Sequence, residues 1–231
     1  MNKTKKIEIA PSILSADFRH LESEVKDAEA AGADRIHCDV MDGHFVPNLT
    51  FGPLIIETVK KCVTIPLDVH LMISNPVDYI YAYCNAGADV LIVHAEACKD
   101  VPGIVSKIKK QGVRAGITVN PDKGVELFLP YLKDIDQVLI MTVYAGFGAQ
   151  KFIPETVGKV RTVFEEATSI DYTVDIEVDG GINDETAKIC AENGANVFVA
   201  GNYVFQSERY GERIQAIRAS AEKSWKKGFA F

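Results

Sequence analysis

Short apolar runs and longer amphipathic stretches alternate along almost the whole chain. The runs are short enough to be buried strands, and the stretches between them repeat apolar residues at helical spacing, as Leu21, Val25 and Ala28 do. The predicted strands are residues 7–13, 35–40, 66–72, 90–94, 114–119, 137–143, 175–178 and 197–200. The predicted helices are residues 21–31, 54–62, 77–85, 101–111, 125–132, 156–167, 185–193 and 210–223. This alternation is typical of a parallel sheet whose strands are connected by helices.

Two architectures are built in this way, a closed barrel and an open doubly wound sheet. Eight strand-helix units in 231 residues fit a compact barrel. An open sheet usually has a GxGxxG turn after its first strand, whereas here that strand runs into Pro11-Ser12-Ile13-Leu14-Ser15. The glycines of three similar phrases, Gly32, Gly87 and Gly194, stand where a helix should end before the next strand. We therefore predict a single (β/α)8 barrel that occupies residues 1–231 as one domain.

Charge and composition restrict the kinds of partner and the cellular location that we expect for this barrel. The formal net charge of −7 argues against a nucleic-acid partner, whose phosphates need a basic face. No run approaches eighteen apolar residues, so no membrane segment is expected. The five cysteines are an odd number without a CxxC pair, which indicates free thiols, and the basic residues 1–6 are not followed by the apolar stretch of an export signal. We expect a cytoplasmic protein.

Polar residues stand where several of the predicted strands end. The carboxyl ends of barrel strands carry the active site, and residues two apart on a strand share one face. Such faces hold His37, Asp39 and Met41 on the second strand, Asp68, His70 and Met72 on the third, and Glu177 and Asp179 on the seventh. If these faces point inward, His37, Asp39, His70 and Asp179 converge at the mouth of the barrel.

Two imidazoles and two carboxylates are suited to one divalent first-row metal ion, with zinc, iron, manganese and cobalt all acceptable. A single His-x-Asp pair is more often only hydrogen-bonded, but four titratable groups at strand ends are costly to bury unless something pairs them. We therefore predict a metal site. Asp68 and Glu177 lie two residues deeper, and we interpret them, together with His94, as hydrogen-bonded residues inside the barrel.

Glycines follow the sixth, seventh and eighth strands. They are Gly146 and Gly148, then Gly180 and Gly181, then Gly201, which precedes Asn202. Each glycine alone could simply turn the chain, but three glycine clusters at one barrel edge favour backbone N–H groups that bind a phosphate. Met41, Met72 and Met141 end three strands; they are either core residues or an apolar cover over a reactive intermediate.

Four segments together resemble the ribulose-phosphate 3-epimerase family. They are residues 11–18, 37–48, 67–72 and 177–182, and the resemblance extends from about residue 9 to residue 205. It implies a barrel of the ribulose-phosphate-binding type and a homo-oligomer. It also implies that His37, Asp39, His70 and Asp179 bind the metal, that Asp39 and Asp179 are the acid–base pair, and that Ser12 and the three methionines contact the substrate.

The reaction implied by this resemblance is epimerisation at C3 of a phosphorylated ketose through an enediolate, with D-ribulose 5-phosphate and D-xylulose 5-phosphate as the expected pair. The chain departs from the family pattern at Tyr144-Ala145, where Asn-Pro is usual, at Ala149, where glycine is usual, and at Asn202-Tyr203. These departures leave another ketose phosphate open as substrate, such as allulose 6-phosphate or a tetrulose phosphate.

Two alternatives of other classes remain. A metal-free lyase or decarboxylase on a related barrel would have a lysine in an Asp-x-Lys-x-x-Asp pattern, and residues 37–42 contain none. A catalytically silent sugar-phosphate sensor would have no need for all four metal-site residues.

Overall fold

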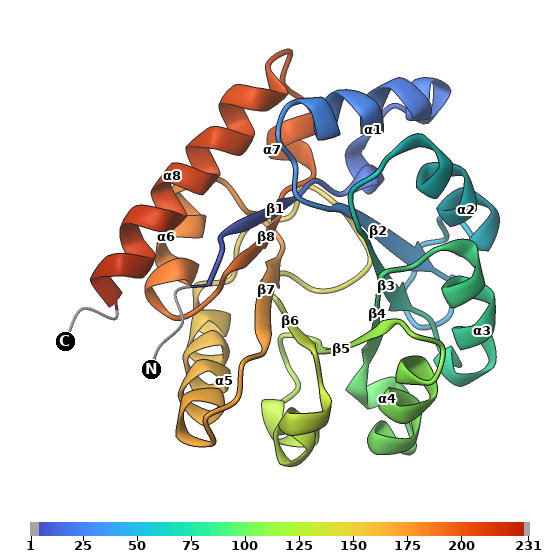
Figure 1. Ribbon diagram of the computed structural model, residues 1–231, viewed down its shortest axis with the longest axis vertical. Coiled ribbons are helices and arrows are strands. Elements are labelled where there is room, and N and C mark those ends of the chain that lie inside the picture. The colour runs from blue at the N-terminus through green and yellow to red at the C-terminus, as the bar shows by residue number, and fades with distance from the viewer. Residues whose placement is uncertain (1–4, 229–231) are drawn as a thin grey trace.

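The protein is a (β/α)8 barrel in the computed structural model, which describes residues 5–228. The basic residues 1–4 lie outside this range. One eight-stranded parallel sheet has the order β1-β8-β7-β6-β5-β4-β3-β2, and its strands form the ring in Figure 1. The strands are β1 Glu8–Ala10, β2 Ile36–Met41, β3 Leu67–Met72, β4 Val90–His94, β5 Arg114–Val119, β6 Gln137–Met141, β7 Asp175–Asp179 and β8 Val197–Val199.

The ring closes between the first two strands through very few contacts. β1 is shorter than predicted because Pro11 has no N–H to continue the ladder, and residues 13–15 form a short 3-10 helix. A single parallel bridge joins Ser12 to His37, and the His37 N–H donates to the carbonyl of Pro11 at 3.0 Å. The closure therefore places Ser12 directly beside the start of the predicted metal site.

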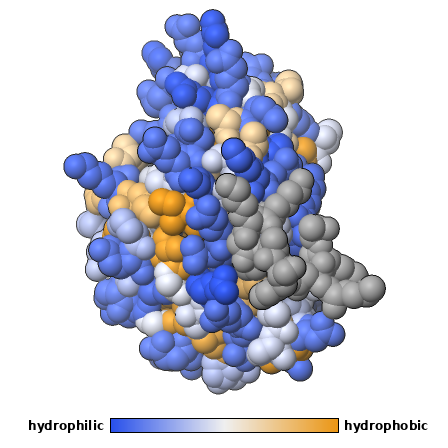
Figure 2. All heavy atoms as spheres, turned by 90° about the vertical axis from the view of Figure 1, so that its left-hand side faces the viewer, coloured by the Kyte–Doolittle hydropathy of each residue, from blue (hydrophilic) through white to orange (hydrophobic). Residues whose placement is uncertain are grey.

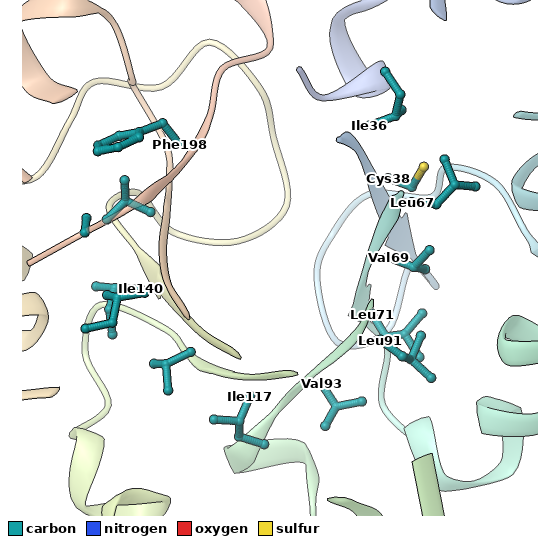
Figure 3. Close-up of a cluster of buried hydrophobic side chains, with 14 of the residues drawn as sticks. Ile36, Cys38, Leu67, Val69, Leu71, Leu91, Val93, Ile117, Ile140 and Phe198 are labelled. Atoms are coloured by element: carbon teal, nitrogen blue, oxygen red, sulfur yellow. The ribbon is translucent and has the colours of Figure 1, made fainter. Parts of the chain in front are cut away.

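Alternate residues of each strand point into and out of the ring. Figure 3 shows outward side chains such as Val69, Leu91 and Phe198 reaching away from the barrel axis toward the helices. These outward residues belong to the large buried core between the strands and the helix layer. The intervening positions, which include His37 and His70, are free to face the barrel interior.

Helices surround the sheet in the expected order. The α-helices are α1 Leu21–Ala30, α2 Pro53–Cys62, α3 Pro76–Ala86, α4 Val101–Lys109, α5 Val157–Ser169, α6 Asp184–Glu192, α7 Asn202–Phe205 and α8 Tyr210–Gly228. The prediction of a helix over residues 125–132 was wrong in type, because this connection forms two 3-10 helices, Val125–Leu127 and Leu129–Asp134. Pro130 prevents a continuous α-helix there, since it lacks an N–H donor and its ring clashes with the preceding turn.

The helix boundaries follow local chemistry. Gly32, Gly87 and Gly194 have φ angles of 96°, 108° and 114°, as predicted for residues that end a helix. Asn183 begins α6 with a complete capping box that includes Thr186.

Figure 2 shows that the face formed by α5, α6 and α8 is mostly hydrophilic, with small apolar patches. Among the described residues, no helix is both long and apolar enough to span a membrane.

Candidate metal centre and substrate cavity

The polar residues predicted at the strand ends face one another inside the barrel. β2 and β3 pair so that His37 lies beside Asp68, Asp39 beside His70, and Met41 beside Met72. On the opposite side of the ring, the pairing of β6 with β7 sets Met141 beside Asp179. The strand register therefore brings the carboxylates, the imidazoles and the methionines to the same end of the barrel.

Four of these residues form a compact group of ligand atoms. One nitrogen or oxygen each from His37, Asp39, His70 and Asp179 lies within 4.8 Å of the others. The Oδ1 atom of Asp39 is 3.4 Å from His37 Nε2 and 3.2 Å from His70 Nδ1. This group has the composition predicted from the sequence, and its spacing suits a single divalent ion.

The second carboxylate oxygen of Asp39 is held by Ser12. The hydroxyl of Ser12 donates a 2.6 Å hydrogen bond to Oδ2 of Asp39, and both residues are buried. The same hydroxyl accepts a hydrogen bond from the N–H of Leu14 at 3.2 Å, which sets its orientation. Ser12 therefore fixes Asp39 in place in addition to lining the cavity.

The two aspartates have opposite protonation tendencies. Burial would raise the pKa of Asp39, but the His37 and His70 rings hold it well below its usual range. Burial, with the Asp39 carboxylate as the next cause, raises the pKa of Asp179 to about 7. Without a cation, Asp39 is therefore the more readily ionised of the two carboxyl groups. A bound cation would lower the pKa of Asp179.

The His37 ring lacks a hydrogen-bond partner at either nitrogen, although it is fully buried. Burial alone would lower its pKa, but Asp39, Asp68 and Glu177 raise it well above the usual value. A buried ring surrounded by carboxylates without a close hydrogen bond is a natural place for a cation at Nε2. The donor set therefore fits a metal ion.

A second acidic group lies deeper in the barrel and contacts the far side of the same ring. Nδ1 of His37 is 3.6 Å from Glu177 Oε1 and 3.9 Å from Asp68 Oδ2. Gln137 Nε2 donates to both carboxyl groups, at 3.0 Å to Asp68 and 2.7 Å to Glu177. Burial and the Asp68 charge raise the pKa of Glu177 to about 8. Asp68 and Glu177 are therefore hydrogen-bonded to Gln137 inside the barrel, as predicted, and together with His37 they form a second group of possible ligand atoms.

A cavity of about 620 Å³ opens above the metal group. Twelve of the predicted site residues line it: Ser12, Asp39, Met41, Met72, Met141, Gly146, Gly148, Asp179, Gly180, Gly181, Gly201 and Asn202. His37 and His70 are fully buried and do not line the cavity. The arrangement separates two imidazoles below the cavity floor from carboxylates that reach its surface.

The glycine loops meet at one side of this cavity. Gly180 and Gly181 have φ angles of 123° and 65°, and a Cβ on Gly181 would lie 2.7 Å from the backbone nitrogen of Phe152. A Cβ on Gly201 would lie 2.6 Å from the hydroxyl of Ser15. These loops therefore require glycine for close packing as well as for any approach of an anion.

Several cavity residues were not predicted. Ser15, Lys151 and Asn183 also line the cavity, and Ser15 donates a 2.5 Å hydrogen bond to Oδ1 of Asn202. Ser15 follows the first strand, so the rule that places active sites at strand ends could have identified it. Lys151 had no distinctive spacing to single it out.

The fold and site define a barrel enzyme with a candidate metal centre at the carboxyl ends of its strands. The sequence also matches the model of the ribulose-phosphate 3 epimerase family over residues 8–205. A relative named ribulose-phosphate 3-epimerase from Bacillus subtilis is 51% identical, with 93% of this chain and 99% of the relative covered. A relative of the same name from Rhodobacter capsulatus is 48% identical, with 96% and 99% covered. The chain belongs to the ribulose-phosphate 3-epimerase family and is an epimerase.

Solved structures show the same fold at low sequence identity. The 3-keto-L-gulonate-6-phosphate decarboxylase from Vibrio cholerae has a TM-score of 0.69 at 15% identity, covering 96% of this chain and all of that chain. A thiamine phosphate pyrophosphorylase from Pyrococcus furiosus has a TM-score of 0.61 at 17% identity, covering 94% and 96%. These likenesses concern the barrel alone. The lyase and the silent sensor are both set aside by the family membership.

Proposed function

We propose that the protein interconverts D-ribulose 5-phosphate and D-xylulose 5-phosphate by inverting C3, with one divalent metal ion held by His37, Asp39, His70 and Asp179. The observation that carries this proposal is geometric: Asp39 on β2 and Asp179 on β7 both line the cavity and both belong to one cluster of possible ligand atoms. Inversion needs a base on one face of the carbon and an acid on the other, and environments that separate two carboxyl pKa values provide both.

In this scheme Asp39 removes the C3 proton and Asp179 returns a proton to the opposite face, with the roles exchanged in the reverse direction. Ser12 keeps Asp39 oriented through its 2.6 Å hydrogen bond. The metal ion, when bound, supplies positive charge that stabilises the enediolate. Met41, Met72 and Met141 cover the reacting carbons with apolar surface, which keeps water away from the carbanion-like centre.

The phosphate of the substrate would lie against the loops after β6, β7 and β8. Gly148, Gly181, Gly201 and Asn202 line this side of the cavity, and we expect their backbone N–H groups to bind the phosphate. Lys151 adds a cationic side chain to the same lining. Backbone N–H groups of this kind bind anions even in an acidic protein.

A related ketose phosphate is the second candidate substrate. Tyr144 and Asn202 both line the cavity, and both depart from the family pattern. Tyr144 is about half exposed, so its ring could contact the sugar end of a longer substrate. The names of the curated relatives favour ribulose 5-phosphate, whereas these two side chains leave allulose 6-phosphate or a tetrulose phosphate as the alternative.

Proton exchange in deuterated water tests the proposal directly. The metal-loaded enzyme should incorporate deuterium at C3 of ribulose 5-phosphate faster than into allulose 6-phosphate or a tetrulose phosphate. Incorporation should require added divalent metal after treatment with a chelator. Exchange at another carbon, or equal exchange in the chelated protein, would contradict the mechanism.

A further inference from the structure

The imidazole of His70 continues into a chain of hydrogen bonds that leads away from the candidate metal. Its Nε2 is 2.9 Å from Nε2 of His94, which is fully buried at the end of β4. On its other side, Nδ1 of His94 is 3.2 Å from Oε1 of Glu96. The two rings therefore link a metal-site residue to a carboxylate outside the metal group.

Donor and acceptor roles can be assigned along this series of hydrogen bonds, starting from Glu96. Glu96 accepts two further hydrogen bonds and acts as an acceptor, so Nδ1 of His94 must donate to it. In the tautomer in which only Nδ1 of His94 carries a proton, its Nε2 accepts, and His70 then donates from its own Nε2. The lone pair of His70 Nδ1 is left facing Asp39 Oδ1 at 3.2 Å. Two electron-rich atoms in that position repel each other unless a cation lies between them.

The chain continues beyond Glu96 to the loop that follows β6. Oε1 of Glu96 accepts hydrogen bonds from the backbone N–H of Asn120 at 2.9 Å and from its side-chain Nδ2 at 3.0 Å. The side-chain oxygen of Asn120 in turn accepts from the backbone N–H of Ala145 at 3.1 Å. Proline, the usual residue at position 145 in the family pattern, has no N–H and could not make this last bond.

Residues 144–150 are held together as a unit. Nε2 of Gln150 donates to the carbonyl oxygens of Tyr144 and Phe147, at 2.7 Å and 2.8 Å. All seven residues line the substrate cavity. These hydrogen bonds tie the residues on either side of Ala145 to the end of the same loop.

We propose that His94, Glu96 and Asn120 position His70 for metal binding and couple occupation of the metal site to the conformation of residues 144–150 through the Ala145 N–H. The inference rests on the proposed function, because it requires a metal ion at His70. His94 and Glu96 act as positioning residues: they select the His70 tautomer that presents a lone pair to the ion.

Metal affinity tests the positioning role. His94→Phe keeps an aromatic ring beside Phe45 but removes both nitrogens, and we expect the Zn²⁺ dissociation constant, measured by competition with a chromophoric chelator, to rise about 10–100-fold. Glu96→Gln keeps the shape but is a weaker acceptor, so its effect should be about 10-fold. Glu208→Gln is the matched control, because Glu208 is exposed and takes no part in these hydrogen bonds. Wild-type affinity in Glu96→Gln would overturn the proposal, even if His94→Phe does not fold.

Hydrogen–deuterium exchange tests the coupling. In the wild-type protein, Zn²⁺ should slow amide exchange in residues 144–150. Ala145→Pro should remove this dependence on Zn²⁺, whereas Ala145→Ser, which retains the N–H, should preserve it. A loop that exchanges at the same rate with and without Zn²⁺ in the wild-type protein would overturn the coupling, as would an unchanged response in Ala145→Pro.

The outcomes separate this inference from the proposed function. A wild-type protein that binds no Zn²⁺, Mn²⁺, Co²⁺ or Fe²⁺ and shows no metal-dependent C3 exchange would refute the proposed function. Suppose instead that the wild-type protein binds metal and epimerises normally, while the His94 and Glu96 variants keep its metal affinity and Ala145→Pro keeps its loop exchange. That result would refute only the inferred positioning and coupling roles.

Discussion

The hydroxyl of Ser12 lies 2.6 Å from Oδ2 of Asp39 and donates to it. Ser12 stands after the first strand and Asp39 on the second, so the bond crosses the seam where the barrel closes. A hydrogen bond to a buried carboxylate stabilises its charged form and restricts its rotation. The bond therefore links the closure of the barrel to the proposed base.

Ser12→Ala tests this link. A hydrogen bond to a charged group contributes about 1.5–3 kcal/mol, so kcat/KM should fall by about 10–100-fold, while Zn²⁺ affinity changes much less because Asp39 Oδ1 remains available. Steady-state kinetics and chelator competition measure the two effects. Ser12→Thr, which retains the hydroxyl, should recover most of the activity; a loss equal to that of the alanine variant would indicate packing as the cause.

His37→Ala and His70→Ala should each remove the bound metal and abolish epimerisation. Both rings are buried and each supplies one of the four ligand atoms. Each variant should still give the circular dichroism spectrum of a folded barrel, since the strands are held by backbone hydrogen bonds. Stoichiometric metal in both variants, measured by elemental analysis, would show that the ion binds elsewhere.

Asp39→Asn and Asp179→Asn should each reduce turnover by at least 10²–10⁴-fold, the range for loss of one positioned acid or base. The carboxamide keeps the size of the side chain but cannot accept or deliver the C3 proton. Single-turnover assays at saturating metal separate this loss from weaker metal binding. Turnover within about tenfold of wild type in either variant would mean that the acid–base pair is misassigned.

Stability of the chelated protein should depend on Glu96 at acid pH. Although burial opposes it, His94 and Asn120 lower the pKa of Glu96 from 4.5 to about 2. Because the folded-state pKa is lower, the stabilisation is present above pH 4.5 and is lost as the pH falls toward 2. Its size should be on the order of 1–2 kcal/mol, since the Glu96 side chain is not completely buried. Denaturant unfolding at several pH values should show a shallower acid dependence in Glu96→Gln.

Tyr144 should influence which ketose phosphate is preferred. Its ring lines the cavity in a position where the family pattern has asparagine, so Tyr144→Asn should change the ratio of kcat/KM for pentulose and hexulose phosphates by about 10-fold. Tyr144→Phe keeps the ring and is the control. An unchanged ratio in the asparagine variant would exclude Tyr144 from specificity.

The barrel and the metal group could be predicted because both depend on strand periodicity. Residues two apart on β2 and β3 share a face, so spacing brought His37, Asp39 and His70 together once that face was taken to point inward, and the family resemblance then implied their role as metal ligands. The contacts of Asn120 and the hydrogen bond from Ser15 to Asn202 could not be predicted from the sequence, because they join loops that are far apart along it. The 3-10 connection at residues 125–134 was missed because its apolar spacing resembles an α-helix, and the effect of Pro130 was underestimated.

The closing seam also has a consequence for synthesis of the chain. β1 pairs along its length with β8, which ends at Val199, and meets β2 through the single bridge at Ser12 and His37. The pairing of β1 is therefore completed only after β8, near the end of the chain, has been synthesised. The contacts of Ser12 are with β2, but Asp179 lies on β7, so the complete catalytic group is assembled only after most of the chain has been synthesised.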